Sequence, residues 1–296
     1  MTLVVGATGL LGTEICRRLA SAGKPFRAFS RRTSDPEKRR TLQELGAEMV
    51  EGDLKERASL DPACRNATDI ITTATSIGSR EEGDSFQTVD VNGQIQLVDA
   101  ARAANVEHFI LISASRGIGD CDNPLIKAKR AIEKRIQESG LVYTILRSSF
   151  FMETWLSPHL GLDVENTKAM IYGSGTNPTS YISLHDIAQF AVDALHNPAA
   201  RNATVELGGP EALTQLAVMA LFEKLTGHRF DREFVSEKEL EARKAAATNP
   251  VGVTLSDLML ASARGDAIDM TEIMQKFSFQ PKSVRQYAAS LLERIK

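Results

Sequence analysis

The alternation of apolar and polar positions predicts a regular succession of strands and helices through the first half of the chain. Continuous apolar runs predict strands at 2–5, 26–30, 47–51, 69–75, 106–115 and 142–146. Between them, apolar residues recur at helical spacing over 10–22, 34–46, 83–105 and 124–139. Strands that alternate with helices build a parallel sheet covered on both faces. The pattern therefore predicts an α/β fold with a doubly wound parallel sheet.

The pattern changes near residue 150. Short strands are predicted at 169–172, 181–183, 203–207 and 230–235. Helices are predicted from 183 to 196, from 213 to 226 and from 284 to 295, and Asn249-Pro250 breaks another helical region. We expect a sheet domain over 1–150 and a smaller, mostly helical C-terminal lobe over 151–296, with the chain recrossing between them.

Several polar residues have predicted structural positions. Glu14 should face outward on the first helix, and the acids and amides of 83–105 should do the same. Ser34 with Glu37, and Ser183 with Asp186, have the spacing of capping boxes at helix starts.

The first strand runs directly into Gly6-x-x-Gly9-x-x-Gly12. Gly6 permits a tight turn, Gly9 removes a side chain where a pyrophosphate would approach, and Gly12 lets the helix pack closely on the strand. The helix N-terminus then directs its N–H groups at the phosphates. The context favours a dinucleotide site over an ordinary strand–turn–helix. The predicted contacts are Gly6, Thr8, Gly9, Leu10, Leu11 and Gly12.

The second strand ends at Ser30-Arg31-Arg32, where a site selective for NAD keeps an acidic residue to bind the ribose 2′-hydroxyl. Two guanidinium groups can instead pair with a 2′-phosphate. The sequence therefore favours NADP over NAD; the alternative is a solvated basic loop.

Further cofactor contacts are expected after the other strands, because ligands bind outside the carboxyl ends of a parallel sheet. These residues are Asp53, Leu54, Thr73, Ala74, Thr75 and Ser113. Asp53 suits two uses, as a partner of the adenine amino group or as a helix N-cap.

The segment 124–139 predicts a basic helix. Ile126, Ile132 and Ile136 share one face and should point to the core. The basic residues are expected elsewhere on the helix; they are Lys127, Lys129, Arg130, Lys134 and Arg135.

Composition excludes several classes of protein. The chain of 296 residues is 43% apolar, enough for one large core and a smaller lobe, and it has no apolar run of about 20 residues. Because the first strand follows Met1 directly, we expect a soluble, cytoplasmic protein with no membrane association. A net charge of −3 gives no case for direct nucleic-acid binding.

The three cysteines, Cys16, Cys64 and Cys121, are scattered and argue against a disulfide framework. No Cys-x-x-Cys or His-x-x-His pair indicates a metal site. A reactive thiol at Cys121 and a proton-donating His159 are minor alternatives.

Several motifs together resemble the NmrA-like atypical short-chain dehydrogenase/reductases. They are Gly6-x-x-Gly9-x-x-Gly12, Ser30-Arg-Arg32, Gly52-Asp53, Lys127-Ala-Lys-Arg-Ala-Ile-Glu133, Tyr143-Thr-Ile-Leu-Arg147 and Tyr181-Ile-Ser-Leu-His-Asp-Ile-Ala188. The resemblance implies a Rossmann domain with a small C-terminal substrate lobe. The family includes NADP-dependent quinone, isoflavone-type and triphenylmethane dye reductases, and also regulators that bind a dinucleotide without turning it over.

The resemblance also implies site residues. Related reductases carry Tyr-x-x-x-Lys, and here the register reads Asn123-x-x-x-Lys127, so the lysine matches and the tyrosine does not. Lys127 and Ser113 are the expected catalytic residues. By analogy Arg147, Ser148 and Ser149 pass under the nicotinamide. Phe150, Phe151 and Trp155 would form an apolar substrate wall, or else simply join the two lobes.

These features favour an NADPH-dependent reductase that transfers hydride to an apolar, conjugated acceptor such as a quinone, which needs no tyrosine proton donor. The alternative is an NADP-binding, redox-sensing regulatory or scaffold protein without turnover. A homodimer or a regulatory protein partner is compatible with either.

Overall fold

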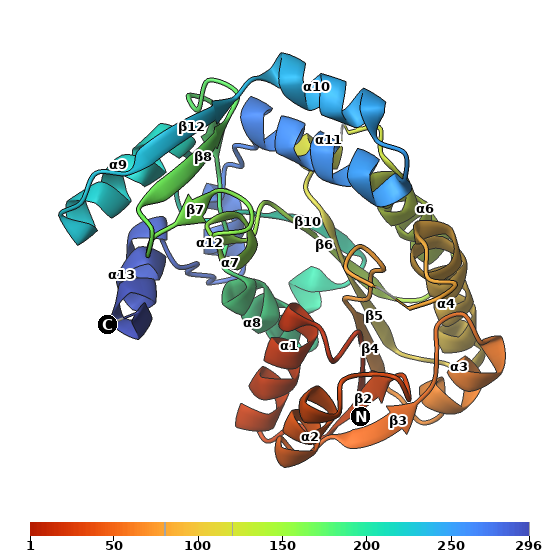
Figure 1. Ribbon diagram of the computed structural model, residues 1–296. Coiled ribbons are helices and arrows are strands. Elements are labelled where there is room, and N and C mark those ends of the chain that lie inside the picture. The colour runs from red at the N-terminus through yellow and green to blue at the C-terminus, as the bar shows by residue number, and fades with distance from the viewer. Residues whose placement is uncertain (80, 120, 296) are drawn as a thin grey trace. The chain divides into compact units, whose positions relative to one another are not determined.

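The computed structural model describes residues 1–79, 81–119 and 121–295 and divides them into two compact units (Figure 1). The first unit contains 1–113, 125–146 and 187–205, and the second contains 114–124, 147–186 and 206–296. The chain therefore passes between the units several times.

The central element is a seven-stranded sheet of order β10-β6-β5-β4-β1-β2-β3. Its strands are β1 (Thr2–Val5), β2 (Phe26–Ser30), β3 (Glu48–Glu51), β4 (Asp69–Thr72), β5 (His108–Ala114), β6 (Tyr143–Ser148) and β10 (Ala203–Leu207). β1 pairs in parallel with both β2 and β4. The order 3-2-1-4-5-6, which reverses direction at β1, is that of the doubly wound dinucleotide-binding fold and confirms the predicted fold class.

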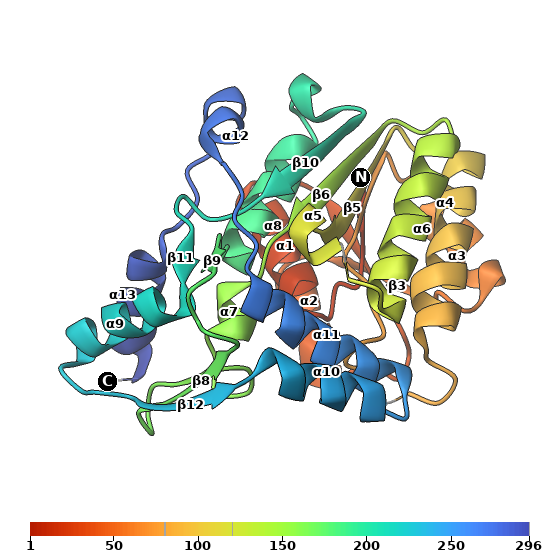
Figure 2. The same ribbon diagram turned by 90° about the horizontal axis from the view of Figure 1, so that it is seen from above.

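Helices cover both faces of this sheet. They are α1 (Leu10–Ser21), α2 (Pro36–Glu44), α3 (Arg57–Cys64), the π-helix η1 (Phe86–Gly93), α4 (Gln94–Ala103), α6 (Pro124–Glu138), α8 (Leu184–Ala194) and the 3₁₀ turn η2 (Pro198–Ala200). Figure 2 shows α3, α4 and α6 side by side on one face and α1 and α8 on the other. The apolar core between sheet and helices includes Leu3, Ile70, Leu97, Phe109 and Ile132.

The second unit contains smaller sheets and most of the C-terminal helices. Its strands are β7 (Leu162–Asp163), β8 (Lys168–Tyr172) and β12 (Asp231–Val235) in one sheet, and β9 (Pro178–Thr179) and β11 (Leu213–Thr214) in another. Its helices are α5 (Arg116–Gly119), α7 (Met152–Trp155), α9 (Gln215–Thr226), α10 (Glu237–Ala246), α11 (Pro250–Arg264), α12 (Thr271–Lys276) and α13 (Val284–Ile295). Among the described helices none is both long and apolar enough to cross a bilayer.

Two predicted capping boxes are wrong. Asp35, not Ser34, caps α2, because its carboxylate accepts the Glu37 N–H at 2.9 Å. Before α8, the Ser183 hydroxyl oxygen does accept the His185 N–H at 3.2 Å, as an N-cap does, and the hydroxyl donates to Glu153. Asp186 accepts the Lys282 N–H instead of completing the box. The predicted strand at 181–183 is also absent as a strand, since Ile182 forms only an isolated bridge.

The predicted outward positions of some polar residues are wrong as well. Glu14 is buried on α1, where it pairs with Arg17 and Arg18. Asp90 and Gln94 are fully buried. The helix predicted over 83–105 is a π-helix continued by an α-helix, so its faces do not follow the 3.6-residue period on which the prediction relied.

Candidate functional site

The glycine turn after β1 is packed too closely for side chains. Gly6 has φ of +83°, and a Cβ there would lie 2.7 Å from the Thr73 hydroxyl oxygen. A Cβ on Gly12 would lie 2.0 Å from the Gly6 carbonyl oxygen. The Thr73 N–H donates to Val5 at 2.9 Å, so the ends of β1 and β4 are held side by side. The two glycines are therefore required by the turn itself.

The start of α1 has the geometry of an anion site. Its N-cap, Gly9, supplies no side-chain hydrogen bond, and the first bond of the helix is from Thr13 N–H to the Gly9 carbonyl. Leu10 is 72% exposed. Amide groups at the positive end of the helix dipole are thus available for a phosphate, as the sequence predicts.

The two arginines that follow β2 have different surroundings. Arg31 pairs with Asp84, with 2.6 Å between Nη1 and Oδ2. The side chain of Arg32 is 88% exposed and lies 3.7 Å from Glu51. Ser30, directly before them, is buried.

Asp53 does not cap the helix that follows it, so that alternative is wrong. α3 begins at Arg57 with Glu56 as its N-cap, whereas the Asp53 carboxylate accepts the Lys55 N–H at 2.8 Å. Leu54 is buried beside it. After β4, the Ala74 carbonyl accepts a hydrogen bond from Gln94, and the Thr75 hydroxyl accepts one from Ile77 N–H.

A buried polar cluster lies where β4 and β5 end. The Lys129 ammonium donates to the Ile112 carbonyl at 3.1 Å, and the Ser113 hydroxyl donates to Glu133 at 2.5 Å. Asp90 accepts hydrogen bonds from the amide and hydroxyl of Ser76. Burial lowers the pKa of Lys129, while the charges of Asp90 and Glu133 oppose that shift. We name Ser76, Asp90, Ser113, Lys129 and Glu133 the buried polar cluster.

Sequence reasoning missed Lys129, which it placed away from the core. Lys127 is exposed on α6, whereas Lys129 shares the sheet-facing side of that helix with Ile126, Ile132 and Ile136. The spacing of Ile126, Lys129, Glu133 and Ile136 already indicated that Lys129 lies on the apolar face of this helix. A lysine on such a face is buried only when it is paired, so a partner had to be expected.

In the second unit, Asn123 is used structurally. Its side-chain amide is buried and donates to Asp257 of α11 at 2.9 Å, and Asp257 also pairs with Lys244 of α10. Asn123 thus anchors the segment 114–124 to α11. The same segment is held by Ser115, whose hydroxyl donates to Asp266 at 2.7 Å.

The last two residues of β6 and those that follow them also belong to the second unit. Arg147 pairs with Glu206 at 3.3 Å, and Ser148 and Ser149 are buried. Burial raises the pKa of the Asp266 carboxyl, and the hydrogen bond from the Ser115 hydroxyl opposes that shift.

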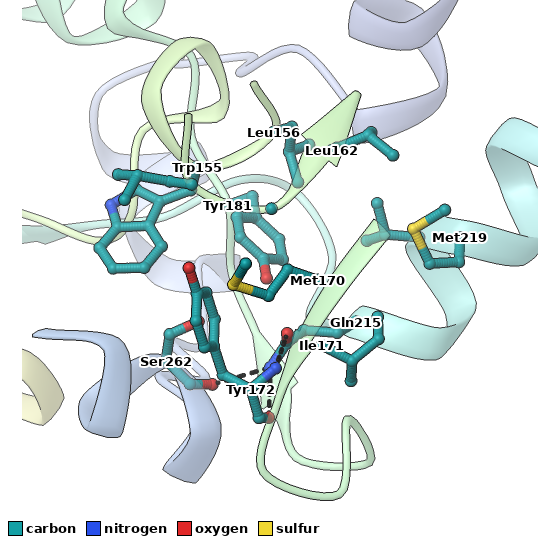
Figure 3. Close-up of a pocket in the computed structure, with 13 residues that line it drawn as sticks. Trp155, Leu156, Leu162, Met170, Ile171, Tyr172, Tyr181, Gln215, Met219 and Ser262 are labelled. Carbon is teal, nitrogen blue, oxygen red and sulfur yellow. Dashed lines mark hydrogen bonds between the residues drawn. The ribbon is translucent and has the colours of Figure 1, made fainter. Parts of the chain in front are cut away.

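Trp155 connects two other aromatic rings. Phe150 meets it edge-on with 4.6 Å between ring centroids, and Tyr172 does so at 6.3 Å. Trp155, Met170, Tyr172 and Tyr181 line a cavity of about 20 Å³, which is room for about one water molecule (Figure 3). Phe150 is buried and Phe151 is half-buried, so the predicted apolar wall is partly internal packing.

The cysteines are expected to resist alkylation in the folded protein. Burial raises the pKa of Cys121, and likewise of Cys16 and Cys64, to about 12, so the thiolate is scarce at neutral pH. Iodoacetamide at about pH 8, which is about half a unit below the pKa of an ordinary thiol, should label none of them until denaturant is added. Rapid labelling of native Cys121, measured by mass spectrometry, would instead support a reactive thiol.

Comparison with known proteins decides the family. The model of the NmrA-like family matches residues 1–272. The chain belongs to the NmrA-like family. This confirms the resemblance that the motifs indicated, and it extends the match through both units.

Two relatives of this NmrA-like protein are named for different activities. The NAD(P)H azoreductase of Xenophilus azovorans is 30% identical over 262 residues, covering 88% of this chain and 85% of that protein. The photosystem II assembly factor Ycf39 of Trieres chinensis is 31% identical over 225 residues, covering 76% and 69%.

The NADPH complex of the Escherichia coli quinone oxidoreductase QOR2 has a similar fold. Its TM-score is 0.78 at 22% identity, with 99% of this chain and 100% of that one covered. At this identity the likeness supports the fold, while the chemistry has to be argued from the residues.

Proposed function

We propose that this protein is an NADPH-dependent reductase that transfers hydride to an apolar, conjugated acceptor such as a quinone. The observation that carries the proposal is the turn at Gly6 and Gly12, where backbone packing excludes any side chain and leaves the start of α1 open to a pyrophosphate. The azoreductase relative supports NAD(P)H-dependent reduction of a conjugated acceptor, and the NADPH-bound structural neighbour supports a fold that can hold this cofactor.

The cofactor would lie along the carboxyl ends of the strands. The pyrophosphate would contact Gly6, Thr8, Gly9, Leu10, Leu11 and Gly12. The adenosine 2′-phosphate would face Ser30, Arg31 and Arg32, and the adenine would face Asp53 and Leu54. Thr73, Ala74 and Thr75 would lie beneath the ribose.

Ser113 and Lys127 are the residues proposed to contact the nicotinamide half of the cofactor, with Arg147, Ser148 and Ser149. Although the Ser113 hydroxyl donates to Glu133, its oxygen can still accept a hydrogen bond. Lys129 is a positioning residue in this proposal, because its ammonium holds the Ile112 carbonyl directly before Ser113.

The fixed position of Asn123 favours a conjugated acceptor. Its amide is committed to Asp257, so the position of the family's tyrosine offers no acidic proton. A quinone would accept hydride, that is, two electrons and a proton. The products would be NADP⁺ and a delocalised hydroquinone anion, and water would then supply the second proton. A simple ketone would need that proton as hydride arrives.

Purified protein with NADPH is therefore expected to reduce a benzoquinone at least about a hundredfold faster than cyclohexanone, the factor that a positioned general acid commonly supplies. Loss of NADPH absorbance measures both rates, and a reaction without protein corrects for direct reduction of the quinone. Inactivity towards quinones, azo dyes and ketones alike would remove the enzyme proposal.

A second candidate is an NADP-binding assembly or regulatory protein without turnover. It is favoured by the assembly-factor relatives and by the structural use of Asn123. Tight NADPH binding by calorimetry, with no NADPH consumed in the presence of any acceptor, would select this candidate.

A further inference from the structure

Three donors from separate parts of the first unit converge on the carboxylate of Asp84. Arg31 Nη1 lies 2.6 Å from Oδ2, Lys55 Nζ lies 2.6 Å from Oδ1, and the Ser79 hydroxyl donates to Oδ2 at 2.5 Å. The Asp84 side chain is only 4% exposed. An acidic side chain is therefore enclosed by two cations and a hydroxyl.

All three charges persist at neutral pH. Burial alone would raise the pKa of Asp84, but the adjoining Lys55 ammonium and the hydrogen bonds from Ser79 and Arg31 outweigh it and lower the pKa. The Asp84 carboxylate beside it in turn raises the pKa of Lys55. Arg31 and Lys55 thus each form a salt bridge with Asp84 in which both partners are charged.

The same donors suit a phosphate monoester. Arginine binds phosphate oxygens through paired N–H groups, and a lysine and a hydroxyl complete such sites. Arg31 directly follows β2, which is where an adenosine 2′-phosphate lies in this fold. Asp84 thus occupies the place that the phosphate would need.

The segment that carries Asp84 can exchange its contacts more easily than a helix could. Residues 73–85 join β4 to η1, and their described part forms turns without a helix or strand. Among its described residues, the Asp84 carboxylate and the Glu82 carbonyl contact the cations, and that carbonyl accepts a hydrogen bond from Lys55 at 3.2 Å.

We propose that Arg31, Lys55 and Ser79 form a binding site for the 2′-phosphate of NADP, which Asp84 occupies until the cofactor displaces it. This inference rests on the proposed function and adds Lys55, Ser79 and Asp84 to the residues that select the cofactor. A phosphate with about two negative charges replaces a carboxylate with one. Asp84 therefore lowers the affinity for NADPH and leaves the affinity for NADH nearly unchanged.

Asp84→Asn is the direct test, with Asp84→Ser as a second variant in case the first folds poorly. Calorimetry should find NADPH bound about tenfold more tightly than by the wild type, as expected when one charged hydrogen-bonding competitor is removed. NADH affinity should change less than about twofold.

Lys55→Met should weaken NADPH binding about tenfold in the wild-type and Asp84→Asn backgrounds.

Glu82→Gln is the matched control. It removes the same charge two residues away, but Glu82 contacts Lys55 through its backbone carbonyl, so the preference for NADPH should not change. Wild-type protein that fails to bind NADPH would overturn the proposed function. If the wild type binds NADPH and the Asp84 variants bind it equally or more weakly, this inference alone would be overturned. Asp84 would then hold Arg31 in position for the cofactor and would not compete with it.

Discussion

Gly12→Ala is expected to abolish measurable NADPH binding and to lower the free energy of unfolding by about 3 kcal/mol, at the upper end of the range for overpacking. The added methyl group would lie 2.0 Å from the Gly6 carbonyl oxygen, a backbone atom that cannot rotate away. To relieve the clash, α1 has to move off the turn, which displaces the amide groups that would hold the pyrophosphate. Calorimetry with NADPH and urea unfolding measure the two effects.

Gly78→Ala is the control for that change. A Cβ on Gly78 would meet no atom within 4 Å, and its backbone needs no glycine, so stability should stay within about 0.5 kcal/mol. A Gly12→Ala protein that binds NADPH like the wild type would show that the turn does not set the position of a nucleotide.

The order of elements could be predicted from the sequence because it depends on local signals. The periods of two and 3.6 residues gave β2, β10 and α13 with the bounds that the structure has. The helix expected to end at 226 ends there, and Asn249-Pro250 separates two helices as expected. Each of these signals acts over a few residues. The glycine spacing predicted the packed turn for the same reason.

Buried polar residues were the main failure, and the cause is long-range pairing. Glu14, Asp90, Gln94 and Lys129 were expected at the surface, since a helix pattern assigns charged and amide groups to water. Partners from other elements bury three of them, as Ser76 does for Asp90, Thr72 for Gln94 and Ile112 for Lys129. Periodicity along one helix contains no information about those partners.

The candidate site was predicted in part. The turn and the start of α1 have the geometry that the glycine spacing predicts. The proposed cofactor and substrate contacts, those of Arg31, Ser113, Lys127 and Phe151 among them, stay predictions. Asp84 and Lys55 could not be found from spacing, because they join β2, the loop after β3 and the loop after β4. Only the tertiary fold brings these charges together.

Lys129→Met is expected to lower the free energy of unfolding by about 3–5 kcal/mol, the cost of leaving a buried opposite charge without its partner. Without the ammonium, the buried carboxylate of Asp90 loses a nearby opposite charge, and the Ile112 carbonyl loses its hydrogen bond. Glu133 keeps its ion pair with Arg130 at 2.5 Å. Lys127→Met makes the same substitution at an exposed position of α6 and should change stability by less than about 0.5 kcal/mol. Urea unfolding of both variants measures the difference.

The double variant Lys129→Met/Asp90→Asn tests whether charge, rather than the volume of the side chain, causes that loss. Asparagine keeps an acceptor for the Ser76 amide and hydroxyl while removing the unpaired charge, so the double variant should regain about 1–3 kcal/mol over Lys129→Met, within the usual range of coupling between contacting residues. Equal losses in Lys127→Met and Lys129→Met, or no recovery in the double variant, would mean that the buried polar cluster is not held by ionic pairing. Recovery would assign Lys129 to the support of the β5 end, where Ser113 would meet the cofactor.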